Sequence, residues 1–95
     1  MPPFSKVSEP DPDATPLGAA RTGFSGFIKS IKIDPTQNGV GATELESRLL
    51  ELGFVEGAHV KILHQGAFGK DPIAVRVKDS TIAIRRRDAM AIFVS

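Results

Sequence analysis

Two histidines, His59 and His64, are the residues of this sequence best suited to metal binding. A tight transition-metal site needs three or four convergent nitrogen, oxygen or sulfur ligands. The histidines lie five residues apart on a predicted strand, nominally on opposite faces, and only Glu56 could approach His59 across a turn. The chain has no cysteine to add a thiolate ligand. We therefore predict no tightly bound metal or cofactor, and at most a weak, exposed iron(II) contact at His59 or His64.

The segment from Gly66 to Lys70 partly matches a phosphate-binding loop. A Walker A loop needs a glycine five residues before its second glycine and a Ser or Thr after the lysine. His64 and Asp71 stand at those positions. No serine or threonine shows the motif spacing to a histidine and an acid that nucleophilic catalysis would predict, and the glutamates of the central segment fit a solvated helix face. The sequence therefore predicts no catalytic residue, no cofactor site and no enzyme activity.

Positive charge is densest at Arg85, Arg86 and Arg87. At the end of a predicted strand these residues present guanidinium groups to solvent, beside Arg76 and Lys78 of the paired strand. Three interpretations fit: a solvated strand end partly neutralised by the following aspartate, a docking patch for an acidic protein, or a nucleic-acid contact. With no Trp or Tyr for base stacking and a net charge of only +1, we expect no nucleic-acid partner.

Length and composition place these residues in one small domain preceded by a tail. The 95 residues leave no room for a second core, and five of the seven prolines fall within the first sixteen residues. We expect residues 1–22 to form a flexible, Pro-rich tail and residues 23–95 to form the globular domain. No apolar run approaches the ~20 residues of a membrane span, and the start does not resemble a signal peptide. We therefore expect a cytoplasmic protein without membrane insertion.

One helix is predicted, over residues 44–52. Thr43 and Glu46 have the spacing of an N-terminal capping box, and Gly53 supplies a left-handed C-terminal stop. Helical periodicity places Leu45, Leu49 and Leu52 on one stripe that faces the core. Leu50 lies off that stripe, where it is either covered by the preceding loop or exposed.

Short apolar segments predict about five antiparallel strands. They cover residues 24–33, 58–64, 73–78, 81–85 and 92–94, with Asp34-Pro35 ending the first and Asp79-Ser80 turning between the third and fourth. Loops are expected over 36–42 and 65–71, and Asp88 is expected to cap one helical turn at 89–91. With a single helix long enough for a crossover, this pattern favours a small, mainly β antiparallel barrel over a parallel sheet.

Two ordered motifs resemble the FeoA family, ferrous iron transport protein A. The first runs from Glu46 to Gly57, and the second comprises Gly69-Lys-Asp-Pro-Ile73 followed by Ala83-Ile-Arg-Arg-Arg-Asp-Ala89. The resemblance covers about residues 24–95. Two loop positions depart from the family pattern: Lys70 interrupts the usual Gly-Asp, and Glu56 stands where Pro is common.

The resemblance implies an SH3-like barrel with a cytosolic accessory role in bacterial iron(II) uptake, acting without catalysis on the membrane transporter FeoB. The physical surface expected to meet that partner combines apolar side chains at the helix end with the arginine run: Leu49, Leu50, Gly53, Phe54, Arg85, Arg86 and Arg87. The alternative is an SH3-like domain associated with a metal-dependent regulator, binding iron, another transition metal or nucleic acid. No helix-turn-helix for DNA binding fits beside the single predicted helix.

Overall fold

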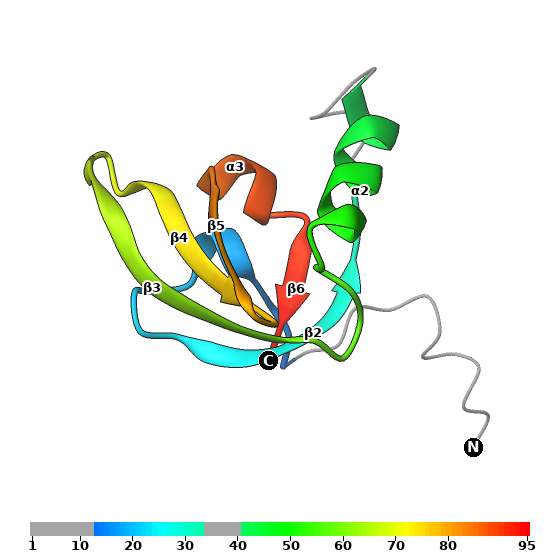
Figure 1. The fold of residues 1–95 in the computed structure, drawn as a ribbon, viewed down its shortest axis with the longest axis horizontal. Helices are drawn as coiled ribbons and strands as arrows, with labels where there is room; N and C mark the ends of the chain where they lie inside the picture. The colour runs from blue at the N-terminus through cyan, green and yellow to red at the C-terminus, as the bar shows by residue number, and fades with distance from the viewer. Residues whose placement is uncertain (1–12, 34–40) are drawn as a thin grey trace.

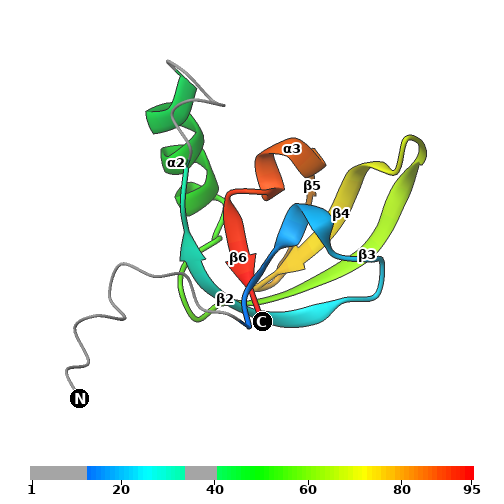
Figure 2. The same ribbon diagram turned by 180° about the vertical axis from the view of Figure 1, so that it is seen from behind.

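The computed structural model describes residues 13–33 and 41–95, which form one curved antiparallel sheet with two helices at the same end (Figures 1 and 2). The predicted tail residues 1–12, the strand stop at Asp34-Pro35 and most of the predicted 36–42 loop lie outside these ranges. In chain order the elements are β1 (Thr15–Pro16), the 3-10 helix η2 (Leu17–Ala19), β2 (Ser25–Ile31), α2 (Ala42–Glu51), β3 (His59–Phe68), β4 (Asp71–Val77), β5 (Ser80–Ile84), α3 (Arg86–Ala89) and β6 (Ile92–Val94).

The strand order across the sheet is β1-β6-β2-β3-β4-β5, and every neighbouring pair is antiparallel. The prediction of a mainly β, antiparallel fold with one principal helix is therefore confirmed. Strand β2 pairs with β3 through its first three residues and with β6 from Ile28 onward, so the sheet bends along this strand. Closure into a barrel stays a prediction, because no ladder within the described ranges joins β1 to β5.

Alternating branched residues supply the core, as their period-two pattern predicts. Val60 and Ile62 of β3 pack with Ile73, Val75 and Val77 of β4, and all five side chains are fully buried. Because successive strand residues point to opposite faces, the intervening polar residues lie on the outer surface. No polar side chain is buried within the described ranges.

The predicted boundary of the tail at residue 22 is too late. Strand β1 pairs with β6, and the Leu17 side chain of η2 is fully buried in the core. Pro16 is tolerated because β1 is an edge strand, where a missing N–H breaks no ladder hydrogen bond. The domain therefore has six strands rather than five, and its described packing begins by Thr15.

Helix α2 ends as predicted but begins differently. Gly53 has φ of +103°, its N–H donates to Leu50 O, and the N–H of Phe54 donates to Leu49 O at 3.0 Å, which together make a Schellman motif. At the start, Gly41 is the N-cap and no side chain caps the helix. The predicted Thr43–Glu46 capping box is not formed, because Thr43 already lies inside the first helical turn.

Turn positions differ from prediction by one to four residues. Strand β3 runs on to Phe68, so the expected 65–71 loop shrinks to Gly69 and Lys70, both with positive φ as in a tight two-residue hairpin. The next turn comprises Lys78 and Asp79 rather than Asp79 and Ser80. The helical turn lies at Arg86–Ala89 instead of 89–91.

Candidate docking groove

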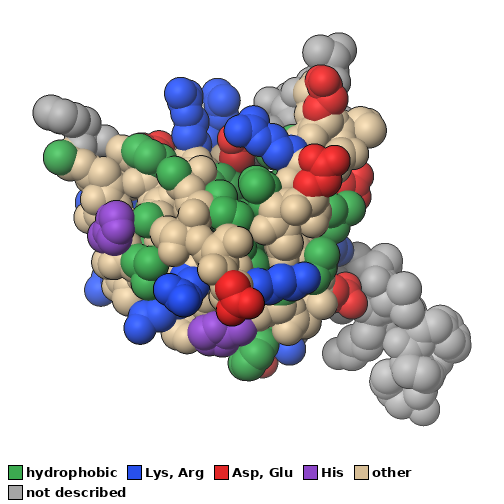
Figure 3. All heavy atoms as spheres, in the orientation of Figure 1, with side chains coloured by type: hydrophobic (Ala, Val, Ile, Leu, Met, Phe, Trp, Pro, Cys, Tyr) green, Lys and Arg blue, Asp and Glu red, His purple; other side chains and the backbone are tan. Residues whose placement is uncertain are grey.

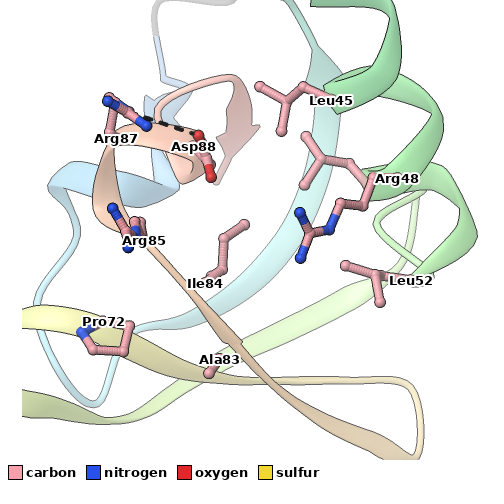
Figure 4. Close-up of a pocket in the computed structure, with 10 residues that line it drawn as sticks. Leu45, Arg48, Leu52, Pro72, Ala83, Ile84, Arg85, Arg87 and Asp88 are labelled. Atoms are coloured by element: carbon pink, nitrogen blue, oxygen red, sulfur yellow. Dashed lines mark ion pairs between the residues drawn. The ribbon is translucent and has the colours of Figure 1, made fainter. Parts of the chain in front are cut away.

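A groove of about 480 Å³ opens between α2 on one side and β5 with α3 on the other (Figure 4). Its apolar lining combines three leucines of the helix with neighbouring strand residues: Leu45, Leu49, Leu52, Pro72, Ala83 and Ile84. Its charged lining comprises three arginines, Arg48, Arg85 and Arg87, with Asp88 as the single acid. The groove is thus an apolar trough with a net positive rim.

The helix α2 forms one wall of the groove because the small sheet covers only part of its surface. Leu49 is 1% exposed and inserts into the core, whereas Leu45 is half-buried and Leu52 is 36% exposed. Figure 4 shows the side chains of Leu45, Arg48 and Leu52 extending from α2 toward β5. The prediction that the whole leucine stripe faces the core is wrong for Leu52, which is left at the groove surface.

The opposite wall is set by the end of β5, where the chain turns directly into α3. Arg85 is the N-cap residue of α3 with extended backbone, and Arg87 projects from the first turn with its side chain 79% exposed. A 3.9 Å ion pair joins Arg87 Nε to Asp88 Oδ1. A pair this exposed contributes little to stability, so the rim keeps its positive character. Figure 3 shows basic side chains beside hydrophobic ones along this end of the molecule.

Arg86 has a different role from its two neighbours. Its Nη1 donates to the backbone oxygens of Gly18 (3.0 Å) and Ala20 (2.8 Å). Its Nε donates to Lys70 O at 2.9 Å, and its Nη2 donates to Gln65 Oε1 at 2.9 Å. One guanidinium therefore ties α3 to η2 and to the β3–β4 hairpin, a structural role that the sequence did not predict for Arg86.

Asp71 replaces the predicted cap of α3. The N–H of Arg86 donates to Asp71 Oδ1 at 2.8 Å, which satisfies a free amide at the helix start from the neighbouring strand β4. Asp88, predicted as the N-cap, lies within the helix and makes no capping hydrogen bond. The Gly-Lys-Asp-Pro-Ile motif therefore places an aspartate where α3 begins.

The structure divides the predicted contact residues into three groups. Leu50 is 47% exposed, which agrees with the predicted alternative of an exposed side chain, but it does not line the groove. Leu49 and Phe54 are buried in the core beside the Schellman motif, so neither side chain is exposed in this structure, and their contact with a partner stays a prediction. Gly53 is half-buried behind them. Only Arg85 and Arg87 combine exposure with a place in the groove.

Seven groove residues were not assigned to binding from the sequence: Leu45, Arg48, Leu52, Pro72, Ala83, Ile84 and Asp88. Arg48 and Leu52 lie four residues apart, a spacing that puts two side chains on the same helix face. That spacing was the available signal for Arg48. Pro72 and Ala83 join the groove only through the pairing of β4 with β5, which no local pattern discloses.

The histidines do not meet in space. A 2.8 Å hydrogen bond joins Ser25 Oγ to the Nε2 of the exposed His59, and the His59 ring packs edge-on against Phe27 with centroids 5.2 Å apart. His64 is exposed further along β3. No cluster of three or more His, Cys, Asp or Glu side chains suited to a metal occurs in residues 13–33 and 41–95. None of the helices in these ranges is long and apolar enough to cross a bilayer.

This small, curved antiparallel sheet with one principal helix is the SH3-like fold of the FeoA proteins whose solved structures match it. The model of the FeoA domain matches residues 15–95, so this chain belongs to the FeoA family, whose members are small accessory SH3-like proteins linked to ferrous iron transport. No match was found among curated proteins.

Solved structures of FeoA proteins share the fold. The chain is 26% identical to Stenotrophomonas maltophilia FeoA, a prokaryotic SH3 domain protein complexed with zinc, over 83% of this chain and 87% of that one, with a TM-score of 0.68. It is 29% identical to FeoA from Chlorobium tepidum, over 84% and 68% of the two chains, with a TM-score of 0.64. A manganese-dependent transcriptional repressor also matches in fold, at 24% identity and a TM-score of 0.71, over 90% of this chain but only 38% of the repressor.

Proposed function

We propose that this FeoA-family chain is a cytoplasmic accessory protein of ferrous iron uptake that binds the cytoplasmic part of a FeoB-type transporter and performs no catalysis itself. Family membership supports the link to ferrous iron transport. The observation that carries the binding role is the groove, in which the exposed Leu52 and the half-buried Leu45 lie beside Arg48, Arg85 and Arg87.

The composition of the groove suits a transient protein contact. Arginine and large apolar anchors carry most of the energy in such interfaces, and charged residues at the rim accelerate association with a partner of opposite sign. The proposed contact set is accordingly Leu52, Arg85 and Arg87, joined by Leu45 and Arg48, whereas Leu50 belongs to the alternative surface on the outer face of α2. This set requires an acidic, partly apolar surface on the transporter.

Binding of the purified cytoplasmic part of the transporter tests the proposal. We expect Leu52→Glu to weaken the complex by at least about tenfold, because it places a buried charge in the interface. Phe27→Glu is the matched control, since Phe27 is also an exposed large apolar residue, at 53%, but lies on β2 beside His59. Equal binding by the wild type and both variants would refute the groove as the docking surface.

Leu50→Glu separates the groove from the surface first predicted. Leu50 is more exposed than Leu52, 47% against 36%, but stands outside the groove lining. A loss confined to Leu52→Glu places the contact inside the groove, whereas a loss confined to Leu50→Glu places it on the outer face of α2 and refutes the groove.

A further inference from the structure

Strand β5 leaves one backbone edge unpaired. It stands last in the sheet order and pairs only with β4, in the register Val77↔Ser80, Arg76↔Thr81 and Ala74↔Ala83. Because a two-residue turn closes on a hydrogen-bonded pair, Val77 with Ser80, alternate residues of β5 face their amides away from β4. The N–H and C=O groups of Thr81 and Ala83 therefore point outward.

No contact inside the described part of the chain uses these outward groups. The backbone hydrogen bonds that cross between elements there include none to Thr81 or Ala83, and the side-chain hydrogen bonds include none either. Figure 4 shows the end of β5 that carries Ala83 running along the groove opposite α2, whose side chains line the groove and leave space between the two walls.

The two edges of the sheet differ in how they are protected. Edge strands usually carry a proline or a charge, or are very short, because an unpaired edge recruits other strands. Strand β1 has only two residues, and one of them is Pro16. Strand β5 has five residues, Ser-Thr-Ile-Ala-Ile, with neither a proline nor a charge. The edge of β5, beside the groove, therefore lacks these protections and can pair with another strand.

We infer that an extended, acidic segment of a partner protein adds to β5 as a further strand, hydrogen-bonding Thr81 and Ala83 while its acidic side chains meet Arg48, Arg85 and Arg87. The inference rests on the proposed function and names its binding mode. Backbone pairing supplies affinity in this type of recognition, and alternate side chains of the added strand supply specificity. Apolar side chains of the added strand contact the apolar lining of the groove.

Charge selects an acidic partner over a second copy of this chain. A second copy of β5 offers only Ser-Thr-Ile-Ala-Ile, which carries no carboxylate for the three arginines of the groove. An acidic strand instead gains three guanidinium groups that the domain leaves largely uncompensated, since the single nearby acid is Asp88.

Proline at position 83 isolates the backbone contribution. The N–H of Ala83 points away from β4, so Ala83→Pro removes an outward donor without removing a ladder hydrogen bond, and proline is tolerated at such an edge position. The matched control is Ala83→Val, which keeps the donor and favours a strand. With the cytoplasmic part of the transporter as the probe, we expect Ala83→Pro to weaken binding about tenfold or more and Ala83→Val to leave it within about twofold.

The outcomes separate this inference from the proposed function. If Leu52→Glu abolishes binding while Ala83→Pro binds like the wild type, the groove is the docking site but strand addition is refuted. If neither variant weakens binding, both proposals fail. If instead the wild type dimerises with concentration and Ala83→Pro abolishes the dimer, the occupant of the edge is a second copy, and the acidic partner is refuted.

A peptide probe keeps the inference testable if Ala83→Pro does not fold. A short synthetic peptide of alternating glutamate and valine is titrated into the unmodified chain, beside the same peptide N-methylated along its pairing edge. We expect the unmethylated peptide to bind and to slow hydrogen exchange at the amides of Thr81 and Ala83, and the methylated peptide to lose both effects. Equal binding by the two peptides, or no binding by either, would overturn strand addition.

Discussion

Replacing Arg86 by alanine removes the side chain that holds three separate segments together. Its guanidinium donates to Gly18 and Ala20 in the N-terminal segment, to Lys70 in the β3–β4 turn and to Gln65 of β3. Loss of this group leaves four acceptors without their donor. We therefore expect the 15–20 segment to detach from α3 more readily and the whole domain to lose stability.

The magnitude follows from which of these hydrogen bonds are shielded from water. The two bonds from Nη1 to Gly18 and Ala20 are part-buried, whereas those to Lys70 and Gln65 are exposed and contribute little. At ~1–1.5 kcal/mol for each part-buried bond, Arg86→Ala lowers the free energy of unfolding by about 2–3 kcal/mol. For a domain of this size that is roughly 10–20 °C in melting temperature. Arg86→Lys recovers only part of the loss, because one ammonium cannot reproduce the planar fork.

Urea denaturation followed by circular dichroism measures the effect, with an unchanged m-value showing that the unfolded reference is the same. Arg87→Ala is the matched control, because Arg87 is the adjacent arginine but makes only the exposed ion pair with Asp88. We expect it to change the free energy of unfolding by less than about 0.5 kcal/mol. Equal losses for the two arginine variants would refute the assignment of Arg86 as a structural residue.

Three further substitutions test the packing that positions the groove. Gly53→Ala should cost about 1–2 kcal/mol in thermal unfolding, because φ of +103° disfavours any Cβ although the nearest atoms, at 3.7 Å, leave room for one; an unchanged melting temperature would contradict the left-handed stop. Leu49→Ala should lower the free energy of unfolding by about 2–5 kcal/mol and Leu50→Ala by less than about 0.5 kcal/mol, since only Leu49 is buried; similar values in urea would show that the helix is packed on another face. Gly18→Ala should lower the free energy of unfolding by about 1–3 kcal/mol, because an added Cβ would press on the backbone of Arg86 and Met90. Hydrogen exchange at residues 17–20 should accelerate. Protection like that of the wild type would mean that η2 does not pack against α3.

The parts of the fold that the sequence predicts are those governed by local periodicity. Val60 and Ile62, with Ile73, Val75 and Val77, repeat every second residue and are all buried. Gly53 ends the helix because a left-handed residue is needed there, a requirement that one residue type reveals. These features depend on neighbours in sequence, so a pattern can predict them.

The features that escaped prediction depend on contacts between distant segments. Leu17 sits in a proline-rich stretch whose composition is typical of disorder, yet β6 and α3 supply the surface that buries it. Arg86 is indistinguishable from Arg85 and Arg87 in sequence, and only the approach of Gly18 and Gln65 gives it a structural role. The groove itself exists because α2 covers the sheet incompletely, which no helical pattern encodes.

A titration of the isotope-labelled chain with the cytoplasmic part of the transporter, followed by amide NMR, tests the docking groove most directly. The account predicts that the largest shift changes gather on α2 and on the end of β5, at Leu52, Ala83 and Arg85, and that Phe27 and His59 on the outer sheet face stay unchanged. Changes centred on Phe27 and His59, or no changes at saturating transporter, would contradict it.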